Sequence, residues 1–264
     1  MPLFFMIAGF CYLCRDYKTY MRKKFFRLVI PYIVFNMIDM LPRQLLASLV
    51  RRPKPMSESI IKAMFYGGEF WFIYALFIIF MIYPIVHKYL AAGRFRMSVA
   101  ALIFLGVSLH GVNVSIFLIN RVVYYLFFFH VGVMLKDFTG STWPSLRMSV
   151  YALPLAFCLW LVMLFGVHGF GVFTALLGIL TCYIMTHYKF FNYVFSRFGG
   201  YSLQLYLLNG ITLGISRAII CNILHVHNPA VIIAFNMLVD FFASYMLIKY
   251  VFMKSKILRL LIGA

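Results

Sequence analysis

Residues 70–87 read FWFIYALFIIFMIYPIVH, and this stretch decides the class of fold. It contains no Asp, Glu, Lys or Arg. As a helix it would extend about 27 Å, close to the thickness of the hydrocarbon core of a bilayer. A segment inside lipid has no water for its backbone N–H and C=O groups, so it must satisfy them within a helix. We therefore expect residues 70–87 to form a transmembrane helix.

The rest of the chain has the same character. Of its 264 residues, 64% are hydrophobic and only 11% are charged, with a mean hydropathy of +0.95. This excess of apolar side chains excludes a soluble globular enzyme, a disordered chain and a disulfide-rich secreted module. The gaps between apolar segments are short and no repeat of fixed period is present. The sequence predicts one all-α membrane domain over residues 1–264, a polytopic helix bundle of about nine spans. The apolar segments are residues 1–14, 25–42, 70–87, 98–110, 120–136, 149–165, 171–187, 201–220 and 230–250.

The charge is strongly basic, with 24 Lys and Arg against 6 Asp and Glu, a formal net charge of +18. In a soluble protein this balance would suggest a nucleic-acid partner. Here we expect none, because the loops are short and basic loops are retained on the cytoplasmic side of membranes. The basic residues concentrate in alternate gaps, beginning with the loop of residues 15–27, and again in the C-terminal tail. This pattern predicts a multi-pass protein with these gaps and the C-terminus in the cytoplasm.

The same orientation places residue 1 outside. The first segment is also short, at about 21 Å for 14 residues. Two explanations stay open: a helix that precedes this chain, or an anchor inserted in the reverse direction because its basic flank follows it. We expect the first.

Five sequence phrases occur in a characteristic order. They are PLFFMIAGF (2–10), RLVIPY (27–32), FWFIYALF (70–77), Arg121 followed by YYLFFF (124–129) and Gly132, and GYSLQLYLLN (200–209). Their order and spacing resemble the acyltransferase-3 family of bacterial integral-membrane O-acyltransferases. The resemblance extends over nearly the whole chain.

The resemblance implies a bundle of ten helices in the bacterial inner membrane. Family members transfer an acyl group, usually acetyl from acetyl-CoA, to hydroxyls of surface polysaccharides or related envelope glycans. The family's first helix carries an Arg and the His expected as catalytic base, and its pattern begins upstream of Pro2. The nine spans would then be the family's ten minus the first, and no catalytic residue is assigned in this chain. Two readings stay open: a chain that is active as it stands, and a chain that is inactive without that helix. Asn209 stands where the family commonly has a second His.

The basic residues after the first segment form the predicted donor-binding site. They are Arg22, Lys23, Lys24 and Arg27. Lys24-x-x-Arg27 resembles the family's Arg-x-x-Arg, which is thought to engage the acyl-CoA donor. The phosphates of coenzyme A suit the guanidinium fork and the lysine point charge. We also expect a helix N-terminus here, which would favour anions. The alternative is a set of charges that only orients the chain and contacts anionic lipid.

Polar residues near or within the apolar segments form a predicted acceptor cavity. They are Glu69, Trp71, Tyr74, Arg121, Tyr124, Asn209 and Asp240. Ionisable groups in a membrane are costly, so each is a functional candidate. Aromatic faces would stack on a sugar, and charges would hold its hydroxyls. The alternatives are an interfacial anchor for Trp71 and interhelical hydrogen bonding for Asn209 and Asp240.

No metal, bound cofactor or disulfide is predicted. Cys11 and Cys14 form a lone C-x-x-C pair, and His130 is the histidine most clearly within a span, though not at the family's catalytic position. Acyl-CoA is expected as a substrate, with the bilayer and a glycan acceptor as partners. Two other functions compete with the acyltransferase: a transporter or flippase, with polar groups along a solute path, and a degenerate, non-catalytic membrane protein.

Overall fold

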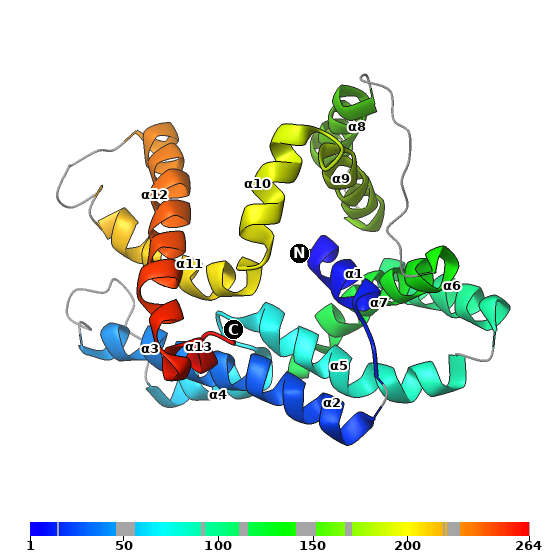
Figure 1. Ribbon diagram of the computed structural model, residues 1–264, viewed down its shortest axis with the longest axis horizontal. Coiled ribbons are helices and arrows are strands. Elements are labelled where there is room, and N and C mark those ends of the chain that lie inside the picture. Colours follow the sequence, from blue (N-terminus) through cyan, green and yellow to red (C-terminus); the bar gives the residue numbers. More distant parts are fainter. Residues whose placement is uncertain are drawn as a thin grey trace. The chain divides into compact units, whose positions relative to one another are not determined.

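The computed structural model describes residues 1–14, 16–45, 56–90, 93–110, 116–140, 152–166, 171–218, 220 and 228–263. This part of the chain is helical and contains no strand (Figure 1). The predicted all-α class is therefore confirmed for these residues. The helices are α1 (Pro2–Phe10), α2 (Tyr17–Lys24), η1 (Phe25–Val29), α3 (Ile30–Leu45), α4 (Met56–Tyr66), α5 (Trp71–Leu90), α6 (Arg94–His110), η2 (Ile116–Leu118), α7 (Ile119–Thr139), α8 (Ala152–Gly166), α9 (Gly171–Met185), α10 (Lys189–Gly199), α11 (Ser202–Ala218), α12 (Pro229–Tyr250), η4 (Phe252–Lys254) and α13 (Lys256–Leu261).

Every apolar segment predicted from the sequence overlaps a helix. Among the described residues, the α-helices α2, α4 and α10 lie in the predicted gaps and α13 lies in the C-terminal tail, as do the short 3₁₀-helices η2 (in a gap) and η4 (in the tail). The sequences of these α-helices are mixed or basic, as in YKTYMRKK for α2 and KILRLL for α13. A hydropathy pattern detects apolar composition rather than helicity, so it misses helices of this kind.

Three helical stretches in the described ranges are long and apolar enough to cross a membrane. They are Ile60–Tyr89, Ile116–Thr139 and Val231–Lys254, and the sharply bent pair α9 and α10 would make a fourth if it formed one span. Other apolar helices are shorter, such as α8 with 15 residues and α6 with 17. A helix of 15 residues extends about 22 Å, less than the hydrocarbon core. The count of nine spans therefore stays a prediction.

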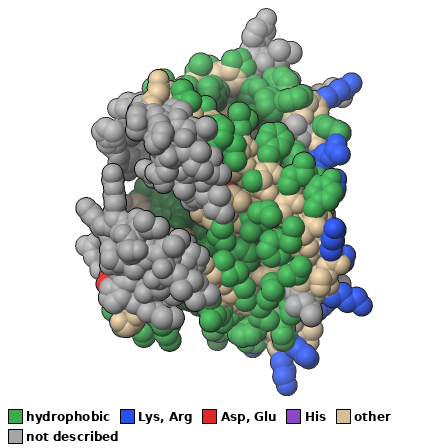
Figure 2. All heavy atoms as spheres, turned by 90° about the vertical axis from the view of Figure 1, so that its left-hand side faces the viewer, with side chains coloured by type: hydrophobic (Ala, Val, Ile, Leu, Met, Phe, Trp, Pro, Cys, Tyr) green, Lys and Arg blue, Asp and Glu red, His purple; other side chains and the backbone are tan. Residues whose placement is uncertain are grey.

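Large hydrophobic side chains are exposed on several helices. Leu102 on α6, Val162 on α8 and Met237 on α12 are 68%, 63% and 71% exposed. Hydrophobic side chains cover much of the face seen in Figure 2, while the Lys and Arg side chains in that view stand at its edge. Apolar surface on this scale requires a lipid environment.

The chain divides into two compact units. Unit 1 comprises Met1–Met21, Phe65–Gly67 and Ala75–Ser196, and unit 2 comprises Arg22–Met64, Gly68–Tyr74 and Arg197–Ala264. The expectation of a single membrane domain stays a prediction.

Unit 1 is built around a close crossing of α1 and α7. A Cβ placed on Gly9 of α1 would stand 2.0 Å from the carbonyl oxygen of Phe129, and one on Gly132 of α7 would stand 2.0 Å from that of Met6. The backbone of each helix therefore contacts a glycine of the other helix. Small residues permit such a close approach between helices in membrane proteins. Residues of two of the resemblance phrases, 2–10 and the phrase ending at Gly132, meet at this crossing.

A second close contact in unit 1 joins α8 and α9. A Cβ on Gly178 would lie 3.0 Å from the indole nitrogen of Trp160. Trp160 therefore lies across the small residue of the neighbouring helix, which lets the two helices approach.

Unit 2 contains a helix pair, α11 and α12, joined by polar side chains. The Thr212 hydroxyl donates to Asp240, and it also lies 2.9 Å from the Ser244 hydroxyl. One turn further along, the Ser216 hydroxyl donates to Asn236. Thr212, Ser216, Asn236 and Ser244 are buried, so these bonds satisfy polar groups that lipid could not.

Unit 2 also packs the segment after α12 against α3. Phe252 of η4 lies beside Phe35 of α3, with ring centroids 6.4 Å apart, and Phe35 is almost completely buried. Ile262, just after α13, is fully buried as well. These contacts place the basic segment around α13 beside η1 and α3.

Candidate functional site

The predicted donor-binding residues lie on one continuous helical run. Arg22, Lys23 and Lys24 form the last turn of α2, and Arg27 lies in η1, which leads directly into α3. Arg22, Lys23 and Arg27 are exposed, and Lys24 is half-buried. The structure thus brings the four cations into one short, accessible stretch.

The expected helix N-terminus at this cluster is wrong. Lys24 and Ile30, on either side of η1, both have α-helical dihedral angles, so the helix does not restart at Phe25. The first turn of this run lies at Tyr17 instead, where the Asp16 carboxylate accepts from the Thr19 N–H at 2.9 Å. The apolar pattern alone placed the start at residue 25, because α2 is too polar to show in it. Any anion binding at the cluster therefore rests on side chains.

The helix widens at the cluster. Phe25–Val29 is a π-helix, and the Ile30 N–H bonds to the Phe25 carbonyl five residues earlier. Such a turn inserts an extra residue into an α-helix and recurs at functional positions. It lies at Arg27, the second basic position of the Lys24-x-x-Arg27 motif.

Two titratable groups on this run have shifted pKa values. Hydrogen bonds from the Thr19 side chain and backbone hold the pKa of the exposed Asp16 below its usual range. Burial raises the pKa of the Tyr20 hydroxyl, whose ring lies 6.0 Å from that of Phe80 on α5. Tyr20 is therefore an anchor for α2 within unit 1 rather than an acid or base.

Three predicted acceptor residues lie together at the start of α5. Glu69 precedes the helix and pairs with Lys62 of α4 at 3.6 Å, with both side chains about half-exposed. The Tyr74 hydroxyl donates to the Met64 carbonyl at 2.8 Å. Trp71 is half-buried. These contacts hold the first turn of α5 against α4.

The other four predicted acceptor residues are distributed over both units. Arg121 and Tyr124 lie on α7 in unit 1, where the Tyr124 ring packs 5.4 Å from that of Phe128. Asn209 on α11 is exposed, and Asp240 on α12 is bonded to Thr212, both in unit 2. The alternative of interhelical hydrogen bonding is therefore observed for Asp240. A cavity shared by all seven residues stays a prediction.

His130 on α7 has both ring nitrogens engaged. Its Nε2 lies 2.9 Å from the Met97 carbonyl oxygen, which can only accept, so Nε2 carries the hydrogen. The Tyr83 hydroxyl, 2.8 Å away, then donates to Nδ1. His130 and Tyr83 are both fully buried. The lone pair that a general base would use is therefore already occupied.

The pairing of Tyr83 with His130 is a feature that the sequence analysis missed. The two residues lie 47 positions apart on α5 and α7. One available signal was that each carries a polar group inside an apolar segment, where an unpartnered group is costly. That signal does not say which polar group pairs with which.

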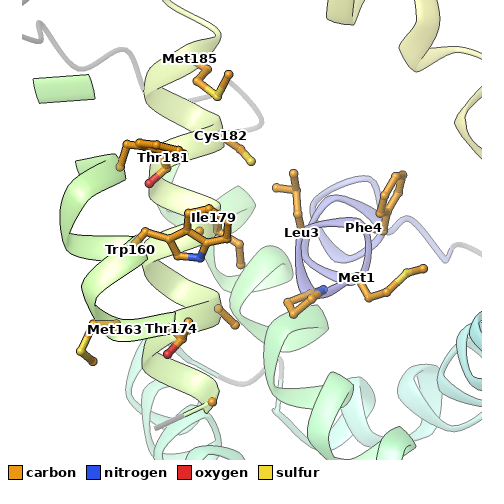
Figure 3. A pocket seen from close by; sticks show the side chains of 15 residues that line it. Met1, Leu3, Phe4, Trp160, Met163, Thr174, Ile179, Thr181, Cys182 and Met185 are labelled. Carbon is orange, nitrogen blue, oxygen red and sulfur yellow. The ribbon is translucent and has the colours of Figure 1, made fainter. Parts of the chain in front are cut away.

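A pocket of about 770 Å³ lies in unit 1 between α1, α8 and α9. In Figure 3, Leu3 of α1 stands across it from Trp160, Ile179 and Cys182, and Phe4 of α1 is also among the lining residues. The lining is mostly apolar, and the Thr181 hydroxyl is committed to the Leu177 carbonyl at 2.8 Å. Such a pocket can hold hydrocarbon. It contains none of the predicted donor or acceptor residues.

Comparisons with curated proteins and with solved structures found no match. A family model described as "Acyltransferase domain", that of the acyltransferase-3 family, matches residues 1–249. The match includes the basic cluster, the α1–α7 crossing and the polar pairs of α11 and α12. This coverage confirms the family resemblance carried by the five phrases, and the chain belongs to the acyltransferase-3 family of membrane acyltransferases.

Proposed function

We propose that this protein is a membrane O-acyltransferase that transfers an acetyl or similar acyl group from acyl-CoA to a hydroxyl of a cell-surface polysaccharide or related envelope glycan. The observation that carries the proposal is the run of accessible cations from Arg22 to Arg27 within the matched family region. We place the protein in the bacterial inner membrane, as a multi-pass bundle of about nine spans with this run on the cytoplasmic side.

The cations suit the donor for a chemical reason. Coenzyme A carries a pyrophosphate and a 3′-phosphate. Arg22 and Arg27 can each offer two parallel N–H donors to phosphate oxygens, and Lys23 and Lys24 add point charges. The cluster would hold the donor by its phosphates, at a distance from the reacting thioester.

The reaction is an acyl transfer. A base removes the proton of the acceptor hydroxyl, the oxygen bonds to the thioester carbonyl carbon, and the C–S bond breaks. Coenzyme A leaves as the thiol after its sulfur takes up a proton. We assign no residue as the base, since His130 is held by Tyr83 and Met97. Glu69, Trp71, Tyr74, Arg121, Tyr124, Asn209 and Asp240 remain the proposed acceptor residues.

The direct test is donor binding by the full chain in lipid nanodiscs. Arg27→Ala should raise the Kd for acetyl-CoA about tenfold, the effect of losing one charge-assisted hydrogen bond. Arg96→Ala removes the same side chain from an exposed position on α6 and should leave the Kd unchanged. Equal affinities for Arg27→Ala and the wild type would remove the cluster from the donor site.

A second assay addresses the reaction. Membranes that contain the protein receive acetyl-CoA with a labelled acetyl group together with envelope polysaccharide. The proposal expects label in the polysaccharide as an alkali-labile ester. Binding of acetyl-CoA without any transfer to glycan would contradict the proposed acceptor while leaving the donor site intact.

A further inference from the structure

Residues 251–263, here called the tail segment, lie beyond the matched family region and contact the proposed donor site. The segment contains η4 and α13, with three cations, Lys254, Lys256 and Arg259, and no acidic residue. All three cations are exposed. A basic segment of this kind could serve only to contact anionic lipid, but its packing argues for a more specific role.

The contact is made by backbone at Gly263. Its φ is +69°, and a Cβ placed there would stand 2.3 Å from the carbonyl oxygen of Arg27 and 3.1 Å from Cγ of Pro31. Glycine is thus required twice, for the left-handed conformation and for the lack of space. The adjacent Ile262 is fully buried, so hydrophobic burial holds the glycine in place.

The carbonyl touched by Gly263 belongs to the π-helix. Arg27 lies at the centre of Phe25–Val29, where the wider helix departs from the usual bonding pattern. At the beginning of the tail segment, the ring of Phe252 packs beside that of Phe35 on α3. The tail segment therefore contacts both the π-helix and the helix that follows it.

We infer that the tail segment is a second part of the donor site. Gly263 positions the π-helix that carries Arg27, and Lys254, Lys256 and Arg259 extend the cationic surface for phosphate groups. The Arg259 Nε donates to the Met253 carbonyl at 2.9 Å, and the terminal N–H groups are not used in that bond. This inference rests on the proposed function, since it assigns the phosphates of acyl-CoA as the ligand.

The positioning role is tested with Gly263→Ala in nanodiscs. The variant should raise the Kd for acetyl-CoA about fivefold to tenfold, because the new methyl group displaces the Arg27 backbone. Gly140→Ala is the matched control. Gly140 has a φ of +63°, and a Cβ placed there would meet nothing within 4 Å, so the substitution imposes the same backbone strain without the contact. Its Kd should equal that of the wild type.

A double-mutant cycle separates positioning from general damage. If Gly263 acts through Arg27, the effect of Gly263→Ala should disappear in the Arg27→Ala background. Additive effects of the two substitutions would overturn the positioning role. A different result would contradict the proposed function: unchanged donor binding by the single variant Arg27→Ala.

The cationic role is tested with Lys256→Gln combined with Arg259→Gln. This variant should weaken acetyl-CoA binding about tenfold and leave binding of acetyl-pantetheine, which lacks the phosphates, unchanged. The loss should persist in nanodiscs of zwitterionic lipid alone. A loss seen only with anionic lipid would assign the cations to lipid headgroups and overturn this part of the inference.

Discussion

Asp16 shows how one exposed carboxylate can define the start of a functional helix. It accepts a hydrogen bond from the Thr19 N–H, in the manner of an N-cap, and so satisfies a backbone donor that α2 leaves open. α2 carries three of the four cations of the proposed donor site. Order at the beginning of α2 is therefore linked to the protonation of a single side chain.

The folded-state pKa of Asp16 is lowered, so its contribution is present above the pKa of the unfolded chain and is lost as pH falls through the folded pKa. We predict that the Thr19 amide exchanges hydrogen faster, relative to its intrinsic rate, as pH falls through this range. Asp16→Asn keeps an acceptor oxygen but does not titrate, and should lose this pH dependence. An unchanged pH dependence in Asp16→Asn would contradict the assignment.

The Tyr83–His130 pair leads to a second prediction at the residue scale. Tyr83→Phe would leave the buried Nδ1 of His130 without its donor, at a cost of about 1–3 kcal/mol in the free energy of unfolding. Thermal unfolding in detergent measures this cost. In a cycle with His130→Phe the second substitution should have a much smaller effect, whereas simple additivity would argue against the bond.

At the scale of elements, the sequence predicted where most helices lie but not which helices contact one another. All nine apolar segments overlap helices, because an apolar run in lipid has few alternatives. α2 and α13 were missed because their composition is polar or basic. The contact of Gly263 with Arg27 joins residues that lie near opposite ends of the chain, and no local pattern encodes such a pairing.

In the candidate site too, local composition indicated the residues but not their structure. The cluster from Arg22 to Arg27 was recognisable because charge in an apolar chain is conspicuous and its spacing matches a family motif. Its secondary structure was predicted incorrectly, since a hydropathy minimum was taken as a helix boundary. The π-helix at Arg27 has no composition that would reveal it.

The α1–α7 crossing gives a prediction for an element contact. Gly132→Ala would place a methyl group 2.0 Å from the Met6 carbonyl oxygen, so the helices must separate. We expect a loss of about 1–3 kcal/mol in the free energy of unfolding, the usual cost of overpacking. Gly106→Ala on α6 meets nothing within 4 Å and should be neutral or slightly stabilising. Thermal unfolding compares the two variants, and a Gly132→Ala protein as stable as Gly106→Ala would contradict the crossing.

At the scale of the whole molecule, composition sets the environment and charge sets the orientation. The exposed apolar side chains require lipid, and the 24 basic residues favour the gaps proposed to face the cytoplasm. Three helical stretches of the described residues are long enough to cross a membrane, and several other apolar helices are shorter than the hydrocarbon core.

The proposed orientation makes a prediction for two exposed residues. Glu58 on α4 lies in a gap expected outside, and Lys189 at the start of α10 lies in a gap expected in the cytoplasm. In a cysteine-free background, Glu58→Cys should react with a membrane-impermeant maleimide added to intact spheroplasts, and Lys189→Cys only in inverted vesicles. Labelling of both from one side would contradict the alternating arrangement.

We propose that the cations from Arg22 to Arg27 bind acyl-CoA at the cytoplasmic surface. Phe26→Cys places a reporter at an exposed position beside Arg27 and keeps all four cations. We expect an impermeant maleimide to label this cysteine in inverted vesicles, and acetyl-CoA to slow the labelling. Reaction from the outside of spheroplasts, or an identical rate with saturating acetyl-CoA, would contradict the claim.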